Sequence, residues 1–203
     1  MTTRRLFVAV PLDEPAFRAV TGIVERIRAD RERTAPNERD VRWVRMDGLH
    51  LTLRFLGPTP EGNVQAVADA VRRAANGHDA FEIGIDGGGA FPNPHRPRTV
   101  WLGVTRGTRQ LTALAEALDR ELVLAGWPAS ERPFRAHLTV ARSDGIPAGA
   151  DVARRLAEAA TGLDQASVAD RVVLFESITG RGAARYEPLE TIALRLRPSS
   201  PAQ

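Results

Sequence analysis

The sequence predicts an α+β fold in which two antiparallel sheets face each other across a central cleft and helices pack outside them. Patterns typical of strand, helix, strand, helix and strand follow in this order about twice along the 203 residues. Two of these strands carry nearly the same tetrad, His50-Leu51-Thr52-Leu53 and His137-Leu138-Thr139-Val140. A pseudo-two-fold relation would bring the two strands together at the cleft. We therefore expect a single domain over residues 1–203, built from two pseudo-symmetric lobes.

The first half of the chain begins with a predicted strand and a long amphipathic helix. Asp13 precedes a stripe of apolar residues at helical spacing, so it is a suitable N-cap. The strand that carries His50 is expected to end at Gly57-Pro58, and Gly87-Gly88-Gly89 is expected to open a loop. The predicted strands cover residues 4–10, 42–45, 49–56 and 81–85, and the predicted helices cover residues 14–33 and about 60–76.

The second half repeats this order. Leucines at helical spacing mark its first helix, which Gly126-Trp127-Pro128 is expected to end. A stretch rich in β-branched residues from Val168 to Ile178 predicts one continuous strand. The predicted strands cover residues 98–104, 134–141, 168–178 and 186–196, and the predicted helices cover residues 109–124 and 151–160.

Composition places the chain among ordinary soluble globular proteins, with 43% hydrophobic and 26% charged residues. No apolar run approaches the ~20 residues that a membrane-spanning helix needs. The short apolar run near the start is followed by Pro11-Leu12-Asp13 without a small-residue cleavage site, so we expect a cytoplasmic protein. Cysteine is absent, which excludes disulfides, thiolate metal sites and cysteine nucleophiles.

All 28 basic residues are arginine, because the sequence contains no lysine. This excludes lysine Schiff bases, the lysine of a phosphate-binding loop and the lysine-nucleotide intermediate of an ATP-dependent ligase. Arginine also suits phosphate better than lysine does, because its planar fork donates two parallel hydrogen bonds.

Each tetrad can present a proton-transfer group and a hydroxyl on the same side of a strand. Side chains alternate faces along a strand, so His50 and Thr52 point one way, as do His137 and Thr139. Near neutral pH one imidazole can be neutral and accept a proton from water, while the other is protonated and can donate to a leaving oxygen. Such a pair suits in-line displacement at phosphorus, which threonine and arginine side chains can assist. This chemistry requires no metal ion and no cofactor.

These tetrads and their flanking segments resemble the two-histidine (2H) phosphoesterase superfamily. Within it, the chain is most similar to the LigT-like RNA 2',3'-cyclic phosphodiesterases, formerly called 2'-5' RNA ligases. Besides the tetrads, the resemblance covers Arg5-Leu6-Phe7-Val8-Ala9-Val10, Trp43, Arg54-Phe55-Leu56-Gly57, Phe91-Pro92-Asn93-Pro94, Arg98-Thr99-Val100-Trp101-Leu102-Gly103-Val104 and Ala141-Arg142.

The resemblance implies a bilobal fold with a central cleft and metal-independent hydrolysis of a 2',3'-cyclic phosphate to a 2'-phosphate. It implies that His50 donates a proton to O3', that His137 accepts a proton from water, and that Thr52, Thr139 and Arg142 hold the phosphate. The expected substrates are RNA 3' ends or nucleotides that carry the cyclic phosphate. No metal, cofactor, membrane or obligate protein partner is expected, and we expect a monomer.

Two other functions remain open from the sequence. The same histidines could run the reaction in reverse as a 2'-5' RNA ligase, or the chain could be a non-catalytic RNA-binding module. A base of the RNA could stack on Phe7 or Trp43. Arg39, Arg42 and Arg45 could guide an RNA strand or could form a solvated face paired with acids. Solvent-exposed turns are expected to hold the two remaining histidines, His78 and His95.

Overall fold

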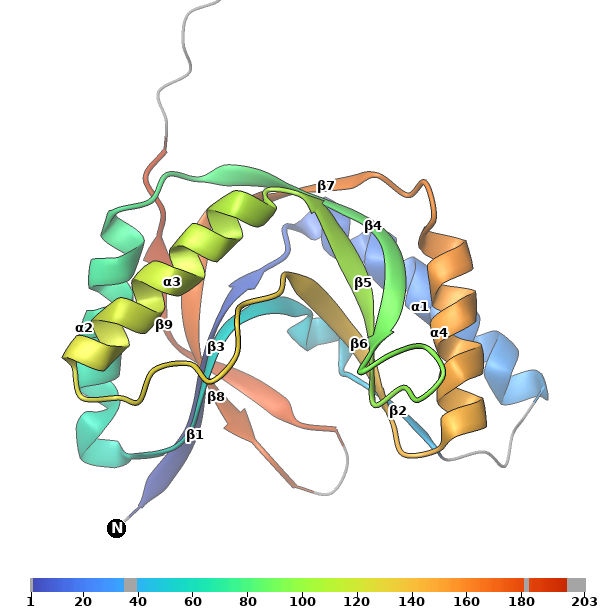
Figure 1. The fold of residues 1–203 in the computed structure, drawn as a ribbon, viewed down its shortest axis with the longest axis horizontal. Coiled ribbons are helices and arrows are strands. Elements are labelled where there is room, and N and C mark those ends of the chain that lie inside the picture. The colour runs from blue at the N-terminus through green and yellow to red at the C-terminus, as the bar shows by residue number, and fades with distance from the viewer. Residues whose placement is uncertain (1, 35–39, 181–182, 197–203) are drawn as a thin grey trace, which may run out of the picture.

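The computed structural model describes residues 2–34, 40–180 and 183–196. It has the predicted α+β fold, with strands paired antiparallel in a curled sheet and helices outside it (Figure 1). The strands are β1 (Thr3–Pro11), β2 (Val41–Trp43), β3 (His50–Pro60), β4 (Phe81–Phe91), β5 (Thr99–Arg106), β6 (His137–Ser143), β7 (Gln165–Ala169), β8 (Arg171–Ile178) and β9 (Arg185–Ala193). The α-helices are α1 (Glu14–Thr34), α2 (Val64–Asn76), α3 (Thr108–Leu124) and α4 (Ile146–Ala160), and 3-10 turns cover Met46–Gly48 and Glu61–Asn63.

The two sheets expected from the sequence are joined into one. The strand order is β7-β4-β5-β6-β3-β1-β8-β9, and β2 pairs with β6. Strands β3 and β6 meet at a single pair, Leu51 with Leu138, and both side chains are fully buried. The apolar residues behind the two tetrads therefore belong to one hydrophobic core, which is why the sheet continues across the join.

The two ends of the sheet are not consecutive halves of the chain. Strand β4 pairs with β5, and β8 returns to pair with β1. The helices cross over as well, because α1 packs on α4 and β7 while α3 packs on α2 and β3 (Figure 1). Each end of the sheet therefore contains strands from both halves of the sequence.

Asp13 is the N-cap that the sequence predicts. Its Oδ1 accepts a hydrogen bond of 3.1 Å from the backbone N–H of Ala16, which has no partner within the helix. Its Oδ2 accepts a bond of 2.8 Å from the N–H of Val168 on β7. The same carboxylate therefore starts α1 and ties the helix to the edge of the sheet.

The predicted loop at Gly87-Gly88-Gly89 is wrong, because these residues lie within β4. A Cβ atom on Gly89 would come within 2.7 Å of the Trp101 ring, and one on Gly88 would come within 3.3 Å of the Ala157 backbone on α4. The glycines allow a tryptophan and a helix to approach the strand closely, so here they mark tight packing instead of a turn.

Other predicted boundaries also change. β3 continues through Gly57 and Pro58, where it pairs with β1. Its other edge is open there, because β6 meets β3 only at Leu51. A proline on an open edge breaks no hydrogen bond between strands. The single strand predicted over residues 168–178 is two strands separated by Asp170, because β7 pairs with β4 and β8 pairs with β1. Helix α4 starts at Ile146, five residues earlier than predicted, with a proline in its first turn.

No α-helix in the described ranges is long and apolar enough to cross a membrane.

Candidate active site

All five residues predicted for the site line one cavity of about 610 Å³, which we call the histidine cavity. His50 is the first residue of β3 and His137 is the first residue of β6, so the two strands deliver their histidines from opposite sides of the join. The other members of the predicted set are Thr52, Thr139 and Arg142. The cavity is also lined by Arg5, Leu6, Phe7, Val44, Gly48, Phe55, Gly57, Thr99, Ser177, Ala184 and Tyr186.

Both histidines are held by the same kind of bond. His50 Nδ1 lies 2.6 Å from the carbonyl oxygen of Gly48, and His137 Nδ1 lies 2.7 Å from that of Arg135. In each case the carbonyl belongs to the residue two positions earlier. A carbonyl oxygen can only accept, so Nδ1 carries the hydrogen in both rings and donates it. In the neutral ring each Nε2 is thereby left without a hydrogen and can accept one.

His50 lies among aromatic rings. Its ring centre is 4.8 Å from that of Phe7, 5.1 Å from that of Tyr186 and 6.0 Å from that of Phe175. Burial lowers the pKa of His50 to about 4, although the bond to Gly48 opposes the shift, and the nearby His137 lowers it further. In the free protein His50 is therefore neutral at pH 7, and its Nε2, 3.0 Å from Thr52 Oγ1, accepts the hydroxyl hydrogen.

His137 has more polar surroundings. Its ring meets Phe91 edge-on at 5.0 Å, and it faces both the histidine cavity and a neighbouring cavity. Partial burial lowers the pKa of His137; the bond to the Arg135 carbonyl opposes the shift, and the positive charge of Arg142 adds to it. Both imidazoles are neutral at pH 7 before substrate binds.

Arg142 is one of two arginines that line the histidine cavity, and the other is Arg5. Arg142 Nη1 lies 3.4 Å from Thr99 Oγ1, and among the described residues no carboxylate lies within ion-pair distance of Arg142. The sequence prediction did not include Thr99 or Tyr186 as site residues. Thr99 is recognisable from the sheet register, because it pairs directly with Arg142. Tyr186 reaches the cavity only because the hairpin of β8 and β9 folds beside His50, which no local pattern indicates.

The weaker candidates lie elsewhere. Arg42 pairs with Asp144 at 3.0 Å and Arg45 with Asp47 at 2.5 Å, as expected for a solvated face, and Arg39 lies outside the described residues. Trp43, His78 and His95 are not part of the cavity lining, whereas Phe7 is part of it. Phe7 is only 2% exposed, so its ring supports His50 and offers little surface to a base. In the described ranges no group of three or more His, Asp and Glu is placed to hold a metal ion.

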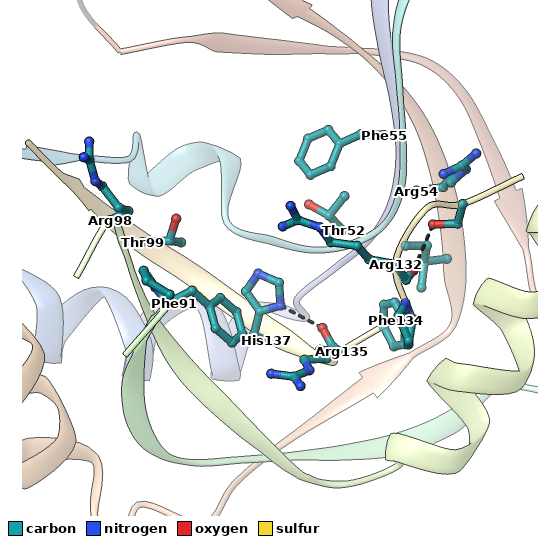
Figure 2. Close-up of a pocket in the computed structure, with 14 residues that line it drawn as sticks. Thr52, Arg54, Phe55, Phe91, Arg98, Thr99, Arg132, Phe134, Arg135 and His137 are labelled. Atoms are coloured by element: carbon teal, nitrogen blue, oxygen red, sulfur yellow. Dashed lines mark hydrogen bonds between the residues drawn. The ribbon is translucent and has the colours of Figure 1, made fainter. Parts of the chain in front are cut away.

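A second cavity, of about 850 Å³, adjoins the first and shares Thr52, Phe55, Thr99 and His137 with it (Figure 2). We call it the arginine cavity. It is further lined by Leu53, Arg54, Phe91, Pro92, Arg98, Ser130, Arg132, Pro133, Phe134 and Arg135. Among the described residues, neither lining contains an aspartate or a glutamate. The two cavities therefore form one continuous cationic surface that meets at His137.

Residues 14–181 match the family model of the 2'-5' RNA ligase superfamily. The chain belongs to this superfamily. Among the superfamily's curated members, it is 36% identical over 141 residues to an RNA 2',3'-cyclic phosphodiesterase of Methanothermobacter thermautotrophicus, covering 70% of this chain and 72% of that protein. It is 31% identical over 153 residues to the enzyme of the same name from Escherichia coli, covering 75% of this chain and 80% of that protein.

Solved structures of the superfamily have the same fold. The crystal structure of E. coli LigT complexed with 3'-AMP is 31% identical, with a TM-score of 0.68 over 95% of this chain and 99% of that one. The resemblance read from the two tetrads is thereby confirmed at the level of family and fold.

Proposed function

We propose that this protein is an RNA 2',3'-cyclic phosphodiesterase that hydrolyses the cyclic phosphate to a 2'-phosphate without a metal ion. The observation that carries the proposal is the pairing of two Nε2 atoms, from two tetrads, in one cavity whose described lining includes three threonines, two arginines and no carboxylate. Carboxylates would repel an anionic substrate, whereas Arg142 attracts it. The relatives that carry this enzyme name support the same reaction.

In the proposed reaction a water oxygen attacks phosphorus in line with the bond to O3'. The bond from water to phosphorus forms and the P–O3' bond breaks. The proton of the water goes to His137 Nε2, and the proton on His50 Nε2 goes to O3'. Thr52, Thr139 and Arg142 donate hydrogen bonds to the non-bridging oxygens.

Binding of the phosphate anion supplies the conditions for acid catalysis. His50 is neutral in the free protein, so it must take up a proton as the negatively charged substrate enters and stabilises the imidazolium. Once Nε2 of His50 carries a hydrogen, it no longer accepts one from Thr52. The threonine hydroxyl is then free to donate to the phosphate.

The product decides between the possible reactions. The protein is incubated with 2',3'-cyclic AMP and with a short RNA that ends in the cyclic phosphate, and the product is identified by chromatography and by its sensitivity to a 3'-specific phosphatase. A 2'-phosphate that forms equally well in EDTA is expected. A 3'-phosphate, or a loss of activity that metal restores, would contradict the proposal. RNA binding without turnover would favour the RNA-binding module, and joining of a 5'-hydroxyl RNA would favour the ligase.

We also propose one domain over residues 1–203 with two pseudo-symmetric lobes, acting as a cytoplasmic monomer. The strand order supports the lobes. Beside β6 lies β5, the first strand of the second half of the chain, and beyond it lies β4 from the first half. Beside β3 lies β1, the first strand of the first half, and beyond it lies β8 from the second half. Light scattering of the purified protein tests the monomer, and fractionation of cells that express it tests the location.

A further inference from the structure

The residues that line only the arginine cavity have no role in the reaction described above, yet this cavity adjoins the two tetrads. It shares His137 and Thr52 with the histidine cavity, so a ligand bound at the two histidines lies next to it. Figure 2 shows Phe55, Arg132 and His137 around the same opening.

Three arginines of this cavity have no carboxylate partner. Arg98, Arg132 and Arg135 are exposed, and among the described residues none of them has an Asp or Glu within ion-pair distance. Arg54, the fourth, is tied to Asp119 at 3.3 Å and to the carbonyl oxygen of Pro128 at 2.6 Å. Three unpaired guanidinium groups around one opening provide donors for a phosphodiester anion.

Aromatic rings accompany these arginines. Phe55 is 63% exposed, which is unusual for a large apolar side chain, and Phe91 and Phe134 are partly exposed in the same lining. Aromatic faces beside cationic groups are the surface on which single-stranded nucleic acids stack their bases. The lining thus offers a place for both a phosphate and a base.

The chemistry of an RNA end fixes what can occupy the cavity. In a 2',3'-cyclic phosphate both O2' and O3' of the last ribose are bonded to the reacting phosphorus. The rest of the RNA therefore leaves through O5', toward the preceding nucleotide. A third cavity follows beyond Arg132 and Phe134, and its lining includes Glu116, Asp119 and Glu131 as well as Arg54, Arg120 and Arg132, so it offers no excess of positive charge for further phosphates.

We propose that the arginine cavity is a subsite for the nucleotide that precedes the cyclic end, with its internucleotide phosphate on Arg98 and Arg132 and a base on Phe55. The inference rests on the proposed function and gives it a substrate class. The enzyme acts on RNA ends in preference to mononucleotides, and one preceding nucleotide supplies most of the preference.

The test compares a dinucleotide that ends in a 2',3'-cyclic phosphate with 2',3'-cyclic AMP. We expect kcat/KM to be about tenfold or more higher for the dinucleotide, as one charge-assisted hydrogen bond would give, and to change little for longer RNAs. Arg132→Gln and Arg98→Gln should each lower kcat/KM on the dinucleotide about tenfold and leave the mononucleotide within about twofold. The double substitution of Arg98 and Arg132 to Gln should also weaken the salt dependence on the dinucleotide by about 0.7 in slope, because the single internucleotide phosphate is then no longer neutralised.

Arg26→Gln is the matched control. Arg26 is an exposed arginine on α1, outside both cavities, and it has no ion pair among the described residues. Its substitution should leave the rates on both substrates unchanged. Affinities of the products, a dinucleotide with a terminal 2'-phosphate and 2'-AMP, are measured on the same variants, so the subsite is tested even if no turnover occurs.

The outcomes separate the two proposals. If neither cyclic substrate is hydrolysed but the dinucleotide product binds more tightly through Arg132, the proposed function fails and the subsite stands. If both substrates are hydrolysed and bound equally well, the subsite is overturned alone. If Arg132→Gln weakens the mononucleotide as much as the dinucleotide, the cavity holds the terminal nucleotide itself, and the subsite proposal is likewise wrong.

Discussion

Strands β3 and β6 carry the same pair of a histidine and a threonine in different surroundings. In both strands the histidine donates its Nδ1 hydrogen to the carbonyl two residues earlier. Five residues further along, β3 has Phe55, which pairs with Phe7 on β1, whereas β6 has Arg142, which pairs with Thr99 on β5. The repeated tetrad thus fixes where the two imidazoles are, and the differing neighbours decide how readily each one holds a proton.

The comparison predicts that both histidines are required although their surroundings differ. His50→Ala and His137→Ala should each lower kcat by ~10²-fold or more, because each removes a proton-transfer group. Steady-state hydrolysis of 2',3'-cyclic AMP measures the decrease, and circular dichroism checks that the variants fold. His95→Ala, an exposed histidine outside the cavity, is the control and should keep full activity. Wild-type turnover by either the His50→Ala or the His137→Ala variant would contradict the two-histidine mechanism.

Substitution of Arg142, the cation of β6, should have the next largest effect on activity. Arg142→Gln is expected to reduce kcat/KM by about 10- to 100-fold, since a hydrogen bond to a charged group contributes about 1.5–3 kcal/mol. Arg142→Lys should restore part of this activity. The neighbouring Arg42→Gln on β2 is the control, because Arg42 pairs with Asp144 and lies outside the cavity lining. Equal decreases for Arg42→Gln and Arg142→Gln would show that general surface charge is responsible.

The two threonines should have unequal effects. Thr139→Val is expected to cost up to about 3 kcal/mol of transition-state stabilisation, and Thr52→Val about 1 kcal/mol, because the hydrogen bond from the Thr52 hydroxyl to His50 Nε2 in the free protein must be broken before His50 can be protonated. Rates of hydrolysis measure both changes, and the serine variants, which keep the hydroxyl, should recover most of the activity. Identical costs at the two positions would mean that the hydrogen bond between Thr52 and His50 has no part in the reaction.

The last prediction concerns stability and leaves the rate aside. The pKa of His50 is lowered in the folded protein, so the unfolded chain binds the proton more readily and stability falls as the pH drops. Between pH 6.5 and pH 4 the free energy of unfolding of the wild type should fall by up to about 3 kcal/mol more than that of the His50→Gln variant. Urea unfolding at several pH values measures the difference, with His137→Gln as the comparison. The same pH dependence in His50→Gln and the wild type would show that His50 is not buried as a neutral group.

Parts of the fold that depend on local patterns were predictable from the sequence. The N-cap at Asp13 and the end of α3 at Leu124 follow from side-chain capping and from apolar spacing, which act within a few residues. The glycines of β4 and the break at Asp170 were not predictable, since a ring, a helix and a pairing partner distant in the sequence decide them.

By itself the sequence determined which side chains share a strand face, because alternation places His50 beside Thr52 and His137 beside Thr139 whatever the fold around them. It also determined the family, through the two tetrads and their flanks. Only the tertiary structure decided the join at Leu51 and Leu138, the aromatic surroundings of His50 and the arginine cavity. These features arise from contacts between strands and loops that are far apart in the chain. Such contacts decide which side chains are buried and which charges lie close together.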